Sequence, residues 1–214
     1  MNIRTREAVR YLGYGSHAID ERTLELIQEC FEELEQIVDV RFIYRIFEIT
    51  SQNIDELKIE KLKIKSKNLY KNLKDCHAVV IFGATLGTTV DRYMKRYSVT
   101  DVTRTVVLQA CAAAMLEEYC DNKQKELEKE FGNDLYLRPR FSPGYGDFSI
   151  LHQKDLLQML DAAKTIGLTM TDGYMLSPTK SVTAVIGISR IKQQCHVKGC
   201  EECSKKDCLY RRSE

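Results

Sequence analysis

Four cysteines near the C-terminal end have the type and spacing of ligands for a metal ion or cluster. They follow the pattern C-x4-C-x2-C-x4-C, at Cys195, Cys200, Cys203 and Cys208. Four thiolates this close together can enclose Zn2+ or an iron–sulfur cluster, and metal binding would order a tail that has few apolar residues. The spacing matches neither a pair of C-x2-C zinc knuckles nor a ferredoxin run, so both metals stay open. Unligated thiols or reversible disulfides are the alternative.

A second segment, RPRFSPGYGDF at residues 138–148, has the composition of a ligand-binding loop. Proline fixes φ and glycine permits close approach of the backbone, which suits a loop that holds a ligand against main-chain amides and carbonyls. Arg140 offers a cationic fork for a carboxylate, and Tyr145 offers an aromatic face. A structural turn with an exposed arginine is the alternative.

The composition excludes several classes of partner. The chain has 214 residues, with 32 Lys and Arg against 31 Asp and Glu. This balance leaves no overall field that would steer the protein onto nucleic acid or an acidic membrane. No stretch approaches the roughly 20 consecutive apolar residues of a membrane helix, and the polar start MNIRTREAVR lacks the apolar segment of a signal peptide. We therefore expect a cytoplasmic protein that binds neither nucleic acid nor membrane.

The remaining cysteines and a run of lysines have simpler interpretations. The eight cysteines do not indicate a secreted disulfide scaffold, because the chain has no export signal and is long enough to bury a core. Those outside the tail lie in predicted helices or beside an apolar strand, and we expect them to pack as small hydrophobic side chains: Cys30, Cys76, Cys111 and Cys120. We interpret the lysines between residues 61 and 74 as a soluble face, with docking of an acidic partner as the alternative.

Hydrophobic periodicity predicts the elements that must position these residues. Helical spacing occurs between Asp20 and Val38, and the segment from Asp101 to Phe131, which has no Pro or Gly, predicts the longest helix. A strand is predicted at 40–50, and the apolar run at 76–87 predicts a buried strand that ends in a tight turn. Further strands are predicted near 168–176 and 182–189, with a helix at 153–164. Strands and helices do not alternate regularly, which favours an α+β fold over a doubly wound parallel sheet. We expect one domain at 1–190 and a separate Cys-rich tail at 191–214.

The loop and its surroundings resemble the activation domain of vitamin-B12-dependent methionine synthase. Residues 140–145 (RFSPGY) resemble the family's RxxxGY pattern, and further matches follow in the right order: GATLG at 83–87, Asp101, a helix bearing Glu117 and Glu118, and the segment 166–187. Together they cover most of residues 75–189. The resemblance implies a single domain with a twisted, mainly antiparallel sheet flanked by helices.

The resemblance also implies a ligand and a set of contacts. In that family the loop holds S-adenosylmethionine, which assigns the binding site here to Arg140, Ser142, Pro143, Gly144 and Tyr145. Arg140 would contact the amino-acid carboxylate, while Gly144 and Tyr145 would lie beside the ligand. An acidic residue of the long helix would also contact it. We assign this role to Glu117, or to Glu118 if the alignment shifts by one residue; a solvated glutamate is the alternative.

Two departures from the pattern are visible. The full-length enzyme follows GY with proline, whereas this chain has Gly146 and Asp147, which is similar to stand-alone versions of the domain. The acidic ligand that the full-length enzyme provides near its N-terminal end has no clear counterpart, and Asp20 is only a remote candidate.

The resemblance implies an accessory role in reductive methylation. We expect the chain to lack the homocysteine, folate and corrinoid modules of the complete synthase and to act on oxidised cobalamin presented by a methionine synthase core without its own activation domain. An electron-donor protein is a further candidate partner, and an iron–sulfur tail could supply the electron. No catalytic dyad is expected, because a sulfonium methyl group needs positioning and no general base. The alternative is a non-catalytic S-adenosylmethionine sensor or scaffold with a metal-binding tail.

Overall fold

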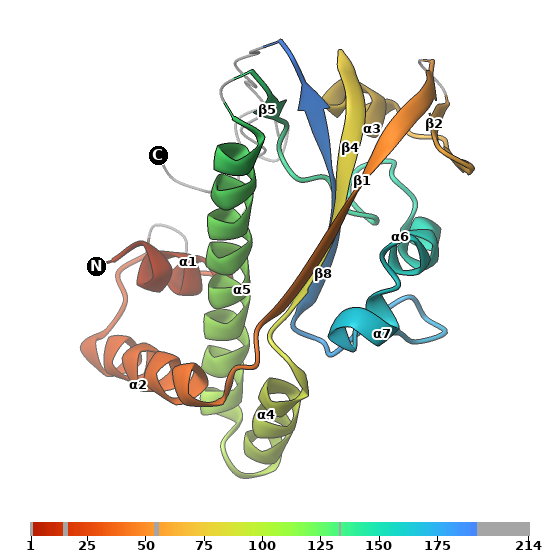
Figure 1. Cartoon of the computed structure of the whole chain (residues 1–214). Helices are drawn as coiled ribbons and strands as arrows, with labels where there is room; N and C mark the ends of the chain where they lie inside the picture. Colours follow the sequence, from red (N-terminus) through yellow and green to blue (C-terminus); the bar gives the residue numbers. More distant parts are fainter. Residues whose placement is uncertain (1, 15–16, 54–55, 133, 192–214) are drawn as a thin grey trace. The chain divides into compact units, whose positions relative to one another are not determined.

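The computed structural model describes residues 2–14, 17–53, 56–132 and 134–191 (Figure 1). These residues form two compact units that the chain enters more than once. Unit 1 contains the described residues of segments 1–39 and 86–122, and unit 2 contains those of segments 40–85 and 123–191. Because the long helix α5 (Val102–Phe131) runs through the boundary at residue 122, its first part belongs to unit 1 and its last part to unit 2.

Unit 1 is helical. It contains α1 (Ile3–Tyr11), α2 (Glu21–Ile37), α4 (Thr88–Thr100) and the first part of α5. Helix α2 begins where the sequence predicted, because the Asp20 carboxylate accepts a hydrogen bond from the Thr23 amide at 2.9 Å and caps the first turn. Its buried residues recur every three or four positions: Ile27, Cys30, Phe31 and Leu34.

Unit 2 is built on an antiparallel sheet. Its strands are β1 (Arg41–Gln52), β2 (Leu57–Ile59), β3 (Leu62–Ile64), β4 (Cys76–Thr85), β5 (Tyr136–Leu137) and β8 (Ser181–Ser189). They lie in the order β3-β2-β1-β4-β8-β5, and every neighbouring pair is antiparallel. The predicted α+β fold with a mainly antiparallel sheet is therefore confirmed.

The core of unit 2 lies between this sheet and short helices. These are α3 (Lys67–Asn72), α6 (Gln153–Leu160) and α7 (Ala162–Ile166), and Figure 1 shows α6 and α7 on the same side of the sheet. Strand β4 is central and almost wholly buried. On the neighbouring strand β1, alternate apolar residues pack against the core, as the period-two pattern predicted: Ile43, Phe47 and Ile49.

Two local predictions were wrong. The helix expected at 153–164 is interrupted at Asp161, which adopts a left-handed conformation (φ 51°) and separates α6 from α7. The strand expected at 168–176 is a hairpin of two-residue strands, β6 (Thr169–Met170) and β7 (Leu176–Ser177). No helix or strand was predicted for the lysine-rich segment, which folds as the β2–β3 hairpin followed by α3.

One other expectation agrees with the structure. Cys30, Cys76, Cys111 and Cys120 are buried and form no disulfide. Burial raises the pKa of the Cys30 thiol to about 12 and also raises that of Cys111, as expected of thiols that serve as packing groups. Across the described ranges, none of the helices has the length and apolar character needed to cross a bilayer.

Candidate functional site

The loop predicted from the sequence starts from a fixed point on the sheet of unit 2. Phe141 forms a bridge with Val185 of β8, in which each backbone amide donates to the other residue's carbonyl at 2.9 Å. Arg140 precedes this bridge and Ser142 follows it. Pro143 and Phe148 are buried, whereas residues 144–147 are exposed. The loop therefore has an anchored base and an accessible tip.

Two consecutive turns shape the tip. The Tyr145 amide donates to the Ser142 carbonyl at 3.2 Å, and Gly144 has φ 89°, so Ser142–Pro143–Gly144–Tyr145 has the signature of a type II turn. The Phe148 amide then donates to the Tyr145 carbonyl at 3.0 Å, with Gly146 at φ 56°. A hydrogen bond of 2.7 Å from the Gly144 amide to the Phe148 carbonyl closes the loop. Proline and glycine are thus used where this backbone requires them.

Asp147 fastens the loop to the start of α3. Its carboxylate accepts hydrogen bonds from the Ser66 hydroxyl at 2.5 Å, the Lys67 amide at 2.8 Å and the Asn68 amide at 3.1 Å. The loss of some hydration would by itself raise the pKa of the exposed Asp147, but these hydrogen bonds to the ionised form prevail and lower it below the usual 3.8. Sequence reasoning noted Asp147 only as a departure from a pattern and missed this role.

Arg140 lies half-buried at the base of the loop. Its Nη1 donates to the side-chain Oε1 of Gln124 at 3.4 Å, and the Gln124 amide nitrogen donates to the Arg138 carbonyl, also at 3.4 Å. Gln124 is in the last part of α5, within unit 2. A helix side chain therefore holds the segment between β5 and the loop, which carries Arg140. No local sequence pattern indicates this role for Gln124.

An aromatic row extends from the loop tip. The Tyr145 ring is 59% exposed and meets Phe141 edge to face, with the ring centroids 5.3 Å apart. Phe141 is followed by Phe148 and then by the His152 ring, which stacks on Phe148 at 5.6 Å. The His152 Nδ1 lies 2.9 Å from an Asp155 carboxylate oxygen. Phe141 thus packs against one side of the Tyr145 ring, and most of the remaining ring surface is available to a planar or cationic ligand.

The two glutamates proposed as acidic ligand contacts, Glu117 and Glu118, lie in the part of α5 that belongs to unit 1. Glu118 pairs with Arg4 of α1 at 2.7 Å, and Arg4 also pairs with Glu35 of α2. Glu118 is therefore engaged in an ion pair between helices. Glu117 is half-buried near Tyr11 of α1; burial, and then the charge of Glu117, raises the pKa of that phenol.

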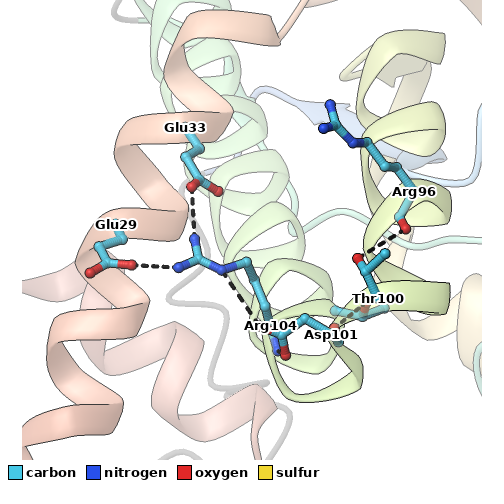
Figure 2. Close-up of polar contacts among 7 residues, drawn as sticks. Glu29, Glu33, Arg96, Thr100, Asp101 and Arg104 are labelled. Carbon is cyan, nitrogen blue, oxygen red and sulfur yellow. Dashed lines mark hydrogen bonds and ion pairs between the residues drawn. The ribbon is translucent and has the colours of Figure 1, made fainter.

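Asp101, another residue that carried the resemblance, organises the turn between α4 and α5. Its carboxylate accepts a hydrogen bond from the Arg104 amide at 2.9 Å, and its carbonyl accepts one from the Thr105 hydroxyl at 2.9 Å. Figure 2 shows the Arg104 side chain reaching α2, where it pairs with Glu29 at 2.6 Å and Glu33 at 2.7 Å. Within unit 1, these ion pairs join the start of α5 to α2.

Four cysteines of the C-terminal tail were predicted to be metal ligands. Cys195, Cys200, Cys203 and Cys208 are outside the described residues. Among the described residues, no group of three or more His, Cys, Asp or Glu side chains could hold a metal ion. The metal site remains a prediction from spacing.

Comparisons with known proteins identify the fold. No family model matches the sequence, and no curated protein matches it. Among solved structures, the chain is similar to one described as the crystal structure of the MetH reactivation domain bound to AdoHcy. The TM-score is 0.60 at 13% sequence identity, over 88% of this chain and 77% of that chain. At this identity the similarity shows that the fold is that of the reactivation domain.

Proposed function

We propose that this chain binds S-adenosylmethionine at the loop from Arg140 to Tyr145 and supports reductive methylation of oxidised cobalamin on a separate corrinoid protein. The observation that carries the proposal is the build of the loop. An R-x-x-x-G-Y segment forms a closed double turn with an exposed tip, on a fold similar to that of a domain solved with AdoHcy. A methionine synthase core without its own activation domain is the partner we propose.

Each loop residue has a defined task in this proposal. Arg140 binds the ligand's carboxylate through charge-assisted hydrogen bonds. Gly144, which has no side chain, lets the ligand approach the backbone at the tip, and Tyr145 places an aromatic face beside the adenine or the positive sulfonium. Ser142 and Pro143 hold the first turn, through the Ser142 carbonyl and the fixed φ of proline. Glu117 is our proposed acidic contact from α5.

The chemistry requires positioning more than proton transfer. When bound, S-adenosylmethionine supplies an electrophilic methyl group that the reduced cobalt of the partner's corrinoid can accept. The chain's own residues fix the ligand's carboxylate end at Arg140 and its ring system at the loop tip, so that the methyl group is presented in one orientation. Transfer from a sulfonium needs no general base, so the proposal assigns none.

The binding site is tested by calorimetry with S-adenosylmethionine and AdoHcy on Arg140→Ala. A charged hydrogen-bonding group contributes roughly 1.5–3 kcal/mol, so we expect about a 10- to 100-fold loss of affinity for both ligands. Arg45→Ala is a matched control, because it removes an exposed arginine from β1 in the same unit. Unchanged affinity in Arg140→Ala would remove this residue from the site.

Glu117 and Glu118 form a second matched pair. Glu117→Gln should weaken S-adenosylmethionine binding, whereas Glu118→Gln should spare it, because the Glu118 carboxylate already pairs with Arg4. The reverse result would shift the assignment by one residue and restore the alternative alignment.

Methyl transfer tests the function beyond binding. The full chain is mixed with a corrinoid protein, a one-electron reductant and methyl-labelled S-adenosylmethionine, and labelled methylcobalamin is measured. Tight binding without methylcobalamin would overturn the accessory role and favour a sensor or scaffold.

The tail is tested separately. We propose that Cys195, Cys200, Cys203 and Cys208 hold Zn2+ or an iron–sulfur cluster, since four thiolates suit either. Anaerobic purification followed by a visible spectrum and iron, sulfide and zinc analysis distinguishes the two. Cys203→Ser should lose the metal and keep S-adenosylmethionine affinity. A colourless wild-type protein without zinc or iron would refute the site.

A further inference from the structure

The β2–β3 hairpin and α3 carry a concentration of positive charge that the overall composition hides. Between Leu57 and Lys74 there are seven lysines and a single acidic residue, Glu60, although the whole chain has a net charge of only +1. The remainder of the chain is therefore net acidic. We call the surface formed by the lysines of this segment the lysine face: Lys58, Lys61, Lys63, Lys65, Lys67, Lys71 and Lys74.

The lysine face is exposed and poorly neutralised. All of its members except the half-buried Lys58 are exposed. Within the described residues, six of the ammonium groups form no ion pair: those of Lys58, Lys61, Lys63, Lys65, Lys71 and Lys74. Lys58 and Lys63 are direct cross-strand partners, an arrangement in which like charges destabilise the hairpin. The fold thus keeps like charges together at some cost in stability.

Protection of the sheet edge explains only part of this pattern. Strand β3 is an edge of the sheet, and lysines on an edge strand discourage pairing with another chain. This reason applies to Lys61, Lys63 and Lys65. It does not apply to Lys67 and Lys71 of α3 or to Lys74 just after it, which recur at helical spacing opposite the buried Leu69 and Leu73.

The lysine face is continuous with the loop described above. The Lys67 amide donates to the Asp147 carboxylate, and a side chain at Gly146 would collide with Asn68. Beside this junction lie three exposed apolar side chains, Tyr145, Ile150 and Leu151. Ile150 packs close to Gly144, since a Cβ built there would lie 3.2 Å from the Ile150 Cδ1. An apolar patch thus adjoins a charged one, as at the centre and rim of a protein–protein interface.

We propose that the lysine face docks an acidic surface of another protein, which thereby reaches the loop tip. Nucleic acid fits less well, because the segment contains no arginine and its single aromatic residue, Tyr70, is half-buried and cannot offer an open stacking platform. The proposal does not depend on the identity of the ligand at the loop.

Triple charge reversal of Lys63, Lys71 and Lys74 to Glu tests the proposal. The full-length variant is titrated with fluorescent poly-L-glutamate in low salt, and anisotropy reports binding. We expect wild type to bind and the variant to lose at least about tenfold in affinity. The control is the triple reversal of Lys125, Lys129 and Lys154, which are also exposed and carry the same change in charge. This control should lose less than about threefold.

Hydrogen exchange, competing ligands and S-adenosylmethionine affinity provide three further tests. Hydrogen exchange with poly-L-glutamate should protect residues 57–74 and 144–151. Equal losses in both triple variants, or no binding by wild type, would overturn the proposal. So would tighter binding to a DNA duplex or to phosphatidylserine vesicles than to poly-L-glutamate in the same buffer. S-adenosylmethionine affinity should be the same in both triple variants, which separates a failure of this surface from a failure of the proposed ligand site.

Discussion

Removal of the Asp147 carboxylate should release the loop from α3. Asp147→Ala deletes the acceptor of three hydrogen bonds and leaves the Lys67 and Asn68 amides of the first helical turn without their partner. A capping side chain contributes about 1 kcal/mol. Because Asp147 is exposed, solvent screens the additional charge, and we expect a total loss of about 1–2 kcal/mol. For a chain of this size that corresponds to a fall in Tm of roughly 3–6 °C.

The sign of the pH dependence follows from the direction of the pKa shift. The pKa of Asp147 is lowered on folding from 3.8, so the ionised carboxylate stabilises the fold at pH values above the unfolded pKa. That stability is lost as the pH falls through the lower folded pKa. Asp147→Asn should therefore be less stable than wild type at pH 7, and the difference should shrink steadily below about pH 4.

Amide exchange provides the most direct assay. In Asp147→Ala the Lys67 and Asn68 amides should exchange faster, and S-adenosylmethionine affinity should fall because the tip is less ordered. Asp172→Ala, an exposed aspartate in the β6–β7 hairpin, is the matched control. Wild-type exchange rates at Lys67 and Asn68 together with a wild-type Tm would refute the role assigned to Asp147.

Two further predictions concern unit 1. Arg104→Met should lower the free energy of unfolding by about 1–2 kcal/mol, because the half-buried Glu33 and the exposed Glu29 lose their shared partner. Urea unfolding measures this, with the exposed Arg22→Met as control, and equal losses would contradict it. Cys30, with its pKa raised to about 12 by burial, should resist N-ethylmaleimide at pH 8 in the native protein and react in urea. Peptide mass spectrometry identifies the labelled residue, and rapid native labelling of Cys30 would show that the thiol is accessible.

The elements predicted correctly are those whose signal is long and repeated. Helices α2 and α5 and strands β1, β4 and β8 each present several periods of a helical or strand pattern, and their burial follows it. The failures involve one residue or very short elements. A single left-handed residue, Asp161, separates α6 from α7, and no periodicity can indicate the two-residue strands β6 and β7.

The loop could be predicted because its conformation depends on its own residues. Pro143, Gly144 and Gly146 specify two turns locally, so the pattern of residue types was informative. Its attachment could not be predicted, because the decisive contact joins Asp147 to Ser66, 81 positions away. The Gln124 contact to Arg140 likewise depends on how the end of α5 meets the strand. Tertiary contacts of this kind leave no mark in local sequence patterns.

The attachment also explains the clearest departure from the resembled pattern, the glycine that stands where the full-length enzyme has proline. Gly146 has φ 56°, which a pyrrolidine ring locked near −65° cannot adopt. The turn from Tyr145 to Phe148 is therefore incompatible with proline at this position. What proline would supply as local rigidity, this chain obtains from Asp147, whose carboxylate ties the flexible glycine turn to α3. The two residues act as a pair: Gly146 allows the turn that brings the loop to the start of α3, and the hydrogen bonds of Asp147 stabilise that contact.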